Sequence, residues 1–106
     1  MLGGFEEAVM WAVYANKDNA YGATIYTKLE EWKQGSLSMG AIYKTLGRLE
    51  TKGFVTSKEG PPEPKRRGRR KKYYTITGSG IDALNEMRKL HQRIDASLGL
   101  QAGGTV

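Results

Sequence analysis

The chain has 106 residues, of which 39% are hydrophobic and 26% charged, and this fits one small domain with a single modest core. A domain of this size buries a limited share of its surface, so we expect that a partner subunit could add stability. Absence of cysteine excludes disulfides and thiolate metal sites, and the longest apolar run, residues 8–15, is far below the roughly 20 residues that span a bilayer, so we expect a soluble cytoplasmic protein without a membrane partner. The net charge of +6 is local, because residues 65–72 carry seven cations and no acid, which leaves ten cations against eleven acids elsewhere and favours a localised anionic partner.

Two amphipathic helices are predicted first. Apolar residues Phe5, Ala8, Val9, Ala12 and Val13 follow helical spacing and predict a helix over residues 4–16. After the turn-forming stretch "NKDN", Asn19 is the expected N-cap of a second helix that reaches about residue 34 and stops at Gly35. Its buried face is predicted from the spacing of Tyr21, Ile25, Leu29 and Trp32.

A third helix is predicted over residues 38–52, with Ser38 as N-cap and Gly53 just past its end. Ile42, Leu46 and Leu49 form its buried stripe. The opposite face is expected to be exposed and cationic; it carries Ala41, Lys44, Thr45, Arg48 and Lys52. We expect Gly47 to mark tight helix packing, because a glycine inside a helix costs roughly 1 kcal/mol relative to alanine.

Two short strands are predicted next, "FVTSKE" and "KYYTIT", joined by a loop of about ten residues that contains "KRRGRRKK". Taken alone, this basic run fits a disordered loop, a targeting signal or a folded loop that binds a polyanion. Because strands flank it, we favour the folded loop. Only one of Lys71 and Lys72 is expected to face a ligand, since neighbouring residues of a strand point to opposite sides.

A last helix is expected from about residue 80 to residue 98, with Ser79 and Asp82 as its capping signature. Its apolar positions repeat at spacings typical of a helix–helix interface. We therefore predict packing on another subunit, on the first helix, or on both. The predicted dimerisation residues are Ile81, Leu84, Met87, Leu90, His91, Ile94 and Leu98. Residues 99–106 are expected to be a disordered tail.

The order helix, helix, helix, hairpin, helix is that of a winged helix-turn-helix, a mostly α fold in which the third helix enters the DNA major groove and the hairpin loop contacts the backbone or minor groove. The segments "GGFEEAVMWAV", "AYGATIYTKLEE", "SMGAIYKTLGRLETKGFVTS" and "RRGRRKKYYTITGSG" resemble, in register over about residues 2–84, the PadR-like transcriptional regulators. That resemblance implies a dimeric bacterial repressor, in some members released from DNA by a small aromatic or hydrophobic effector, and in shorter members dimerised by one C-terminal helix. The family's wing often reads R-G-G-R, and here an arginine, Arg67, replaces the first glycine.

We therefore predict a winged-helix domain over residues 1–76 and a dimerisation helix over residues 77–98, in a homodimer that binds double-stranded DNA through helix 38–52 and wing 61–72. The predicted DNA-binding residues are Ser38, Met39, Gly40, Ala41, Tyr43, Lys44, Thr45, Arg48, Lys65, Arg66, Arg67, Gly68, Arg69, Arg70 and Lys72. A winged-helix module that binds a protein or RNA through the same basic patch is the alternative.

Catalysis, metal binding and a cofactor find no support in the sequence, which has one histidine and no motif that would cradle a phosphate. Core packing explains both tryptophans. Trp11 is the first candidate to stack on a planar effector if the protein has such a site.

Overall fold

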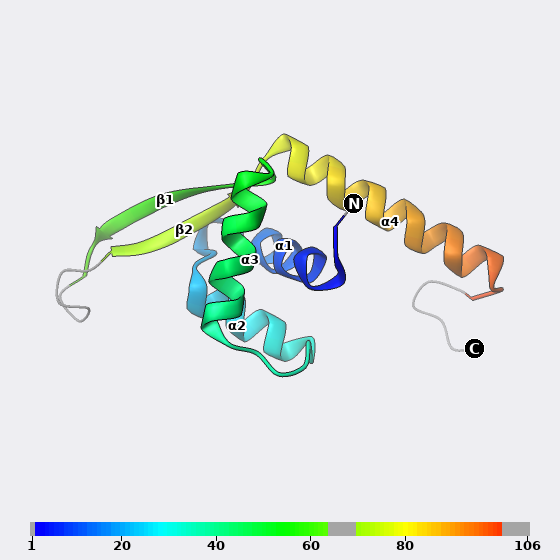
Figure 1. Cartoon of the computed structure of the whole chain (residues 1–106), viewed down its shortest axis with the longest axis horizontal. Coiled ribbons are helices and arrows are strands. Elements are labelled where there is room, and N and C mark those ends of the chain that lie inside the picture. The colour runs from blue at the N-terminus through cyan, green and yellow to red at the C-terminus, as the bar shows by residue number, and fades with distance from the viewer. Residues whose placement is uncertain (1, 64–69, 101–106) are drawn as a thin grey trace.

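The computed structural model describes residues 2–63 and 70–100. Its elements are the helices α1 (Gly4–Asn16), α2 (Gly22–Glu31), α3 (Met39–Thr51) and α4 (Gly78–Ser97), a short 3-10 turn (Lys17–Asn19), and the strands β1 (Val55–Pro62) and β2 (Arg70–Ile76). The predicted element order and the mostly helical fold class are confirmed. In Figure 1, α1, α2 and α3 form the body, the hairpin extends from one side, and α4 extends from the other.

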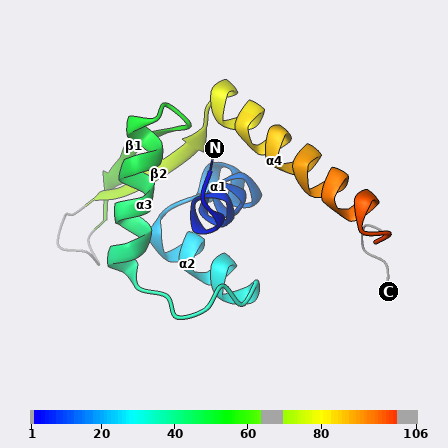
Figure 2. The ribbon, with the colours of Figure 1, turned by 45° about the vertical axis from the view of Figure 1, so that its right-hand side comes forward.

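The core lies where α1, α2, α3 and the base of the hairpin meet. Val9, Met10 and Val13 of α1 are buried, as are Ile25 and Leu29 of the predicted stripe of α2 and the whole predicted stripe of α3. The first half of α4 closes this core, since Leu84 and Met87 are buried against it. Figure 2 shows the second half of α4 leaving the body.

Helix α2 differs from its prediction at both ends. Asn19 belongs to the 3-10 turn and does not cap α2; the N-cap is Tyr21, whose backbone N–H donates to the Thr24 hydroxyl at 3.0 Å. The helix ends at Glu31, because Lys33 adopts a left-handed conformation with φ of 54°. Trp32 therefore leaves the buried face and is 41% exposed.

Helix α4 also begins differently from the prediction. Ser79 lies inside the helix, and the N-cap is Thr77, whose hydroxyl accepts from the Gly80 N–H at 3.0 Å and donates to the Gly53 carbonyl at 2.7 Å. The earlier start is favourable because the same side chain caps α4 and ties it to the end of α3. Gly53 itself, with φ of 80°, ends α3 as predicted.

The hairpin is longer than predicted and is fixed to the helices at its base. The strands pair antiparallel from Val55↔Ile76 to Pro62↔Arg70, with a register shift between Glu59 and Pro62. The Tyr74 N–H donates to the Ala20 carbonyl at 2.8 Å, so β2 is joined to the chain just before α2. The hairpin thus extends from the three-helix body in one direction (Figure 1).

Candidate nucleic-acid interface

The exposed face of α3 begins at a capped helix end. The Ser38 side chain accepts a hydrogen bond from the Ala41 N–H at 3.1 Å, as predicted for the N-cap. Beyond it, Tyr43 is 45% exposed and Lys44 is exposed without an ion pair to any described residue. The predicted contact residues of this helix that are exposed or half-exposed are Ser38, Met39, Gly40, Ala41, Tyr43, Lys44 and Arg48.

Thr45 does not belong to this face, and its predicted exposure is wrong. Only 1% of its surface is accessible. The reason is helical geometry, since Thr45 lies three residues after Ile42 and four before Leu49, on the buried stripe itself. Its hydroxyl accepts a hydrogen bond from a terminal nitrogen of Arg48 at 3.3 Å, so Thr45 helps to orient the exposed Arg48 side chain.

Tyr43 packs α3 against the start of α2. A Cβ placed on Gly22 would collide with the Tyr43 hydroxyl and would lie 2.8 Å from its ring carbon Cζ. The absence of a side chain at Gly22 therefore sets how closely the two helices approach. Tyr43 nevertheless remains 45% exposed.

Two glycines leave the same face of α3 bare. A Cβ added at Gly40 or at Gly47 would meet nothing within 4 Å, and both residues are exposed. The prediction that Gly47 marks tight helix packing is therefore wrong. Because the two residues are seven apart, about two helical turns, they share one side of α3.

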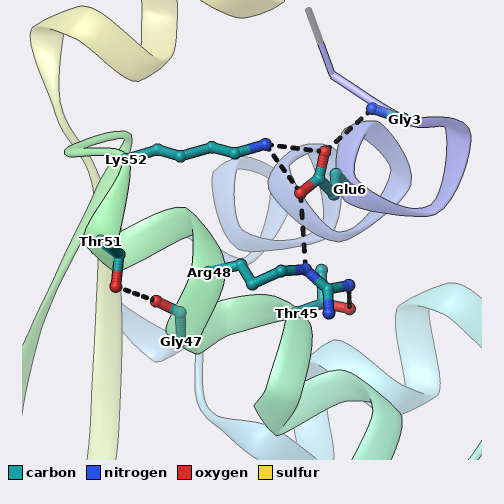
Figure 3. Close-up of polar contacts among 7 residues, drawn as sticks. All are labelled: Gly3, Glu6, Thr45, Gly47, Arg48, Thr51 and Lys52. Carbon is teal, nitrogen blue, oxygen red and sulfur yellow. Dashed lines mark hydrogen bonds and ion pairs between the residues drawn. The ribbon is translucent and has the colours of Figure 1, made fainter.

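A carboxylate from α1 holds the other end of α3. Glu6 Oε2 lies 2.9 Å from Lys52 Nζ and 3.7 Å from Arg48 Nε, and Glu6 Oε1 accepts from the Gly3 N–H at 2.9 Å (Figure 3). The Gly3 hydrogen bond, together with Lys52, holds the pKa of this carboxyl below its ordinary value. Arg48 and Lys52 are thus paired cations, unlike Lys44.

Strand β2 places its two lysines on opposite sides, as predicted. Lys71 Nζ lies 3.1 Å from Glu63 Oε1 and 4.3 Å from the centre of the Tyr21 ring, and the hydrogen bond to Glu63 raises the pKa of Lys71. The Tyr21 and Tyr73 rings meet edge to face at 5.4 Å. Lys71 therefore fixes β2 to α2.

Lys72, on the opposite side of the strand, is exposed and pairs with no described residue. Arg70 is exposed and has only a loose contact, 3.9 Å, with Glu59. The other predicted wing residues, Lys65, Arg66, Arg67, Gly68 and Arg69, lie outside the described residues, as does the predicted tail from residue 101 onward.

The predicted dimerisation residues of α4 fall into two groups. Leu84 is 2% exposed and Met87 is 9% exposed, because both pack into the chain's own core; their assignment to a surface that faces a partner is wrong. Leu90 is partly buried beside them. The exposed apolar side chains are Ile81, Ile94 and Leu98, at 43%, 42% and 66%.

His91 is exposed at the edge of α4 and contacts α1. Its Nε2 is 3.1 Å from Glu7 Oε1, and the other oxygen of Glu7 accepts from the Trp11 indole N–H at 3.1 Å. Trp11 is half-buried and faces a cavity of about 400 Å³. The cavity is lined by Gly4, Glu7, Ala8, Trp11, Trp32 and Gln34.

Four residues of these sites were not predicted from the sequence: Glu6, Glu7, Tyr21 and Glu63. Glu7 and Trp11 are four apart on one helix, a spacing that could have indicated their contact. The pair of Glu6 and Lys52 joins residues 46 apart. No periodicity in the sequence links such positions.

Within residues 2–63 and 70–100, no three His, Asp or Glu side chains gather in a way that could hold a metal ion. None of the helices described is long and apolar enough to cross a membrane.

Known proteins match both the sequence and the fold. The model of the transcriptional regulator PadR-like family matches residues 12–86. Among solved structures, a PadR-like transcriptional regulator from Bacillus cereus is 22% identical at a TM-score of 0.72, over 90% of this chain and 87% of that one. A PadR-like transcription factor from Bacteroides fragilis is 24% identical at 0.74, over 90% and 86%. A PadR family regulator from Clostridium difficile is 28% identical at 0.66, over 90% and 94%. No curated protein matches significantly.

Proposed function

This chain belongs to the PadR-like family of transcriptional regulators, and from that premise we propose that it is a homodimeric, sequence-specific DNA-binding repressor that occupies a promoter. The observation that carries the proposal is the free face of α3. Its first two turns expose Gly40, Ala41, Tyr43 and Lys44, and of these Tyr43 also packs with one part of its ring against Gly22 of α2. A capped helix end with a bare, cationic face suits entry into a major groove.

In this proposal the N-terminal half of α3 reads base edges. The free N–H groups of the first turn and the Tyr43 hydroxyl are suited to phosphate oxygens, whereas Lys44 and Arg48 can reach acceptors on bases. The absence of side chains at Gly40 and Gly47 lets the helix backbone approach closely. Ser38 fixes where the helix starts and therefore its register on the duplex.

The hairpin supplies affinity that does not depend on sequence. Lys72 and Arg70 are exposed near its far end, directly after the basic run from Lys65 to Arg69 in the sequence. Arginine forks bind phosphates with two hydrogen bonds and are attracted to narrow minor grooves. Lys71 is excluded from this role because Glu63 and Tyr21 already engage it.

Dimerisation is assigned to α4, treated as a unit over residues 77–98 that follows the winged-helix domain of residues 1–76. Ile81, Ile94 and Leu98 expose apolar surface that the described residues leave uncovered. Burial of this surface against a second copy would stabilise the dimer by roughly 25 cal/mol for each Å² of apolar area removed from water. The pairing would then set the spacing between two α3 helices on a palindromic site.

An effector, if one regulates the protein, is assigned to the Trp11 cavity. Trp11 and Trp32 offer planar apolar surfaces that suit a small aromatic or hydrophobic compound. Glu7 connects this cavity to His91 of α4. Titrating such compounds while following tryptophan fluorescence tests the assignment, and an unchanged spectrum in Trp11→Phe identifies the responding ring.

The whole proposal, including the cytoplasmic location that DNA binding requires, is tested by selecting duplexes from random sequence and measuring their anisotropy across salt concentrations. Log affinity should fall with log salt at about −0.9 per phosphate contacted. Competition with structured RNA separates the alternative, a module that binds RNA or protein. Equal competition by RNA, or the absence of any selected duplex, contradicts the proposal.

A further inference from the structure

We propose that Glu6 is a specificity-determining residue of the α3 face: it competes with DNA phosphates for Arg48 and Lys52, so that these cations are released only where a base contact outweighs the carboxylate. This inference rests on the proposed DNA-binding function and adds a role for a residue that lies outside α3. Its basis is the four-contact arrangement in Figure 3.

The carboxylate is held rigidly. Its Oε1 accepts from the Gly3 N–H at 2.9 Å and from Lys52 at 3.1 Å, and its Oε2 accepts from Lys52 at 2.9 Å. The Glu6 side chain is only 13% exposed, while Lys52 and Arg48 are 41% and 51% exposed. A shielded anion with a backbone hydrogen bond thus faces two cations that are more exposed to solvent than it is.

Arg48 is held from two sides. Its Nε lies 3.7 Å from Glu6, and one terminal nitrogen donates to the Thr45 hydroxyl at 3.3 Å. The guanidinium therefore lies back toward α1 and the helix, with one terminal nitrogen unengaged by these two groups. To place its fork on a guanine edge, Arg48 has to give up the contact with Glu6.

Loss of the Arg48–Glu6 contact destabilises the complex equally on every DNA sequence, whereas the new contact that Arg48 makes depends on the base it meets. A bidentate contact with a matching base contributes more than a single phosphate contact does. On non-matching DNA the two cations stay with Glu6 and add little affinity. Removal of the carboxylate charge frees both cations for any phosphate and therefore reduces discrimination.

Lys44 provides an internal comparison on the same helix. It is exposed like Lys52 but pairs with no described carboxylate. Lys44 should therefore contribute its full charge to non-specific binding, whereas Lys52 should contribute almost none while Glu6 is present.

The test compares Glu6→Gln with Glu30→Gln, which removes the same charge from an exposed carboxylate of α2 that pairs with no described cation. Binding is measured by anisotropy to a duplex selected by the wild type and to its scrambled version. Glu6→Gln should bind the scrambled duplex about two- to fivefold more tightly, as expected for loss of one or two ion pairs. Its salt slope should steepen by up to about 1.8, or two phosphates. Glu30→Gln should change neither quantity.

A second set of variants tests whether Glu6 acts through Lys52. In the Glu6→Gln background, Lys52→Met should reverse about half of the steepening, whereas in the wild type it should leave the slope unchanged. Lys44→Met should lower the slope by about 0.9 in either background. Folding of Glu6→Gln is checked by circular dichroism. If it does not fold, the comparison of Lys52→Met with Lys44→Met in the wild type still tests the proposal.

The possible failures are distinguishable. A wild type that selects DNA, with Glu6→Gln identical to Glu30→Gln in salt slope and discrimination, overturns the role of Glu6 and leaves the proposed function standing. Equal losses from Lys44→Met and Lys52→Met in the wild type overturn it as well. A wild type that shows no preference among duplexes overturns both proposals.

Discussion

Replacing Gly47 by alanine should stabilise the free protein and weaken its binding to DNA. Gly47 lies in the middle of α3, where a Cβ would meet nothing within 4 Å. Alanine therefore gains its full helix preference over glycine, about 0.8–1.0 kcal/mol, with no steric cost. For a domain of this size the melting temperature should rise by about 4–8 °C.

The DNA effect follows from the position of Gly47 on the bare strip that it shares with Gly40. An added methyl group there would hold the helix away from the groove and weaken base contacts. We expect a loss of about 1 kcal/mol, the lower end of what one base contact contributes, or roughly fivefold in affinity for the selected duplex. The measurements are thermal unfolding by circular dichroism and anisotropy at one salt concentration.

Gly80 in the first turn of α4 is the matched control. A Cβ there would collide with the Phe54 carbonyl and lie 2.8 Å from Ile76 Cγ2, so Gly80→Ala should cost about 1–3 kcal/mol despite the same gain in helix preference. If Gly47→Ala were less stable than the wild type, the conclusion that a Cβ at this position meets open space would be wrong. Unchanged affinity in a stabilised Gly47→Ala would refute the placement of this strip against DNA.

Three further predictions concern the hairpin, α4 and acid stability. Lys72→Met should lower the salt slope of DNA binding by about 0.9, whereas Lys71→Met should leave it unchanged; equal effects would mean that Lys71 also contacts DNA. The double change Ile94→Glu and Leu98→Glu should give folded monomers in sedimentation, because both residues are exposed in the single chain; a persisting dimer would place the interface elsewhere. Truncation before α4 is a poorer test, since it removes Leu84 and Met87 from the core. The lowered pKa of Glu6 means that its contribution to stability is complete above its ordinary pKa of 4.5 and is lost as pH falls through the lower folded-state value; Glu6→Gln should remove this part of the acid dependence of chemical unfolding.

Local signals in the sequence predicted α1 and α3 closely. Apolar residues at helical spacing mark α1, and α3 has a serine cap at one end and a glycine just past the other. The two wrong caps have different causes: at α2, Asn19 is taken up by the 3-10 turn and Thr24 bonds back to the Tyr21 N–H, whereas at α4 two hydroxyl residues lie close together. Thr77 caps α4 in place of Ser79 because its hydroxyl also bonds Gly53, a contact made only in the folded chain.

The errors on exposed faces have a similar cause. Thr45 was assigned to the exposed side of α3 by its polarity, although its spacing from Ile42 and Leu49 places it inside. Spacing alone could not separate the apolar positions of α4 that enter the chain's own core, Leu84 and Met87, from exposed ones such as Ile94 and Leu98. The contacts of Glu6 and Glu7 with distant residues depend on tertiary packing, so no local pattern predicts them.

Glu6 and Glu7 also have a mechanical consequence. Successive residues of a helix point about 100° apart, so one turn of α1 presents two carboxylates in different directions. Glu6 contacts the end of α3, and Glu7 contacts His91 of α4 and the indole of Trp11. A roll of this turn about its own axis cannot move one carboxylate without moving the other. A rotation of this turn of α1 about the helix axis would therefore disturb the contacts of Glu6 with Lys52 and Arg48 together with the contact of Glu7 with His91.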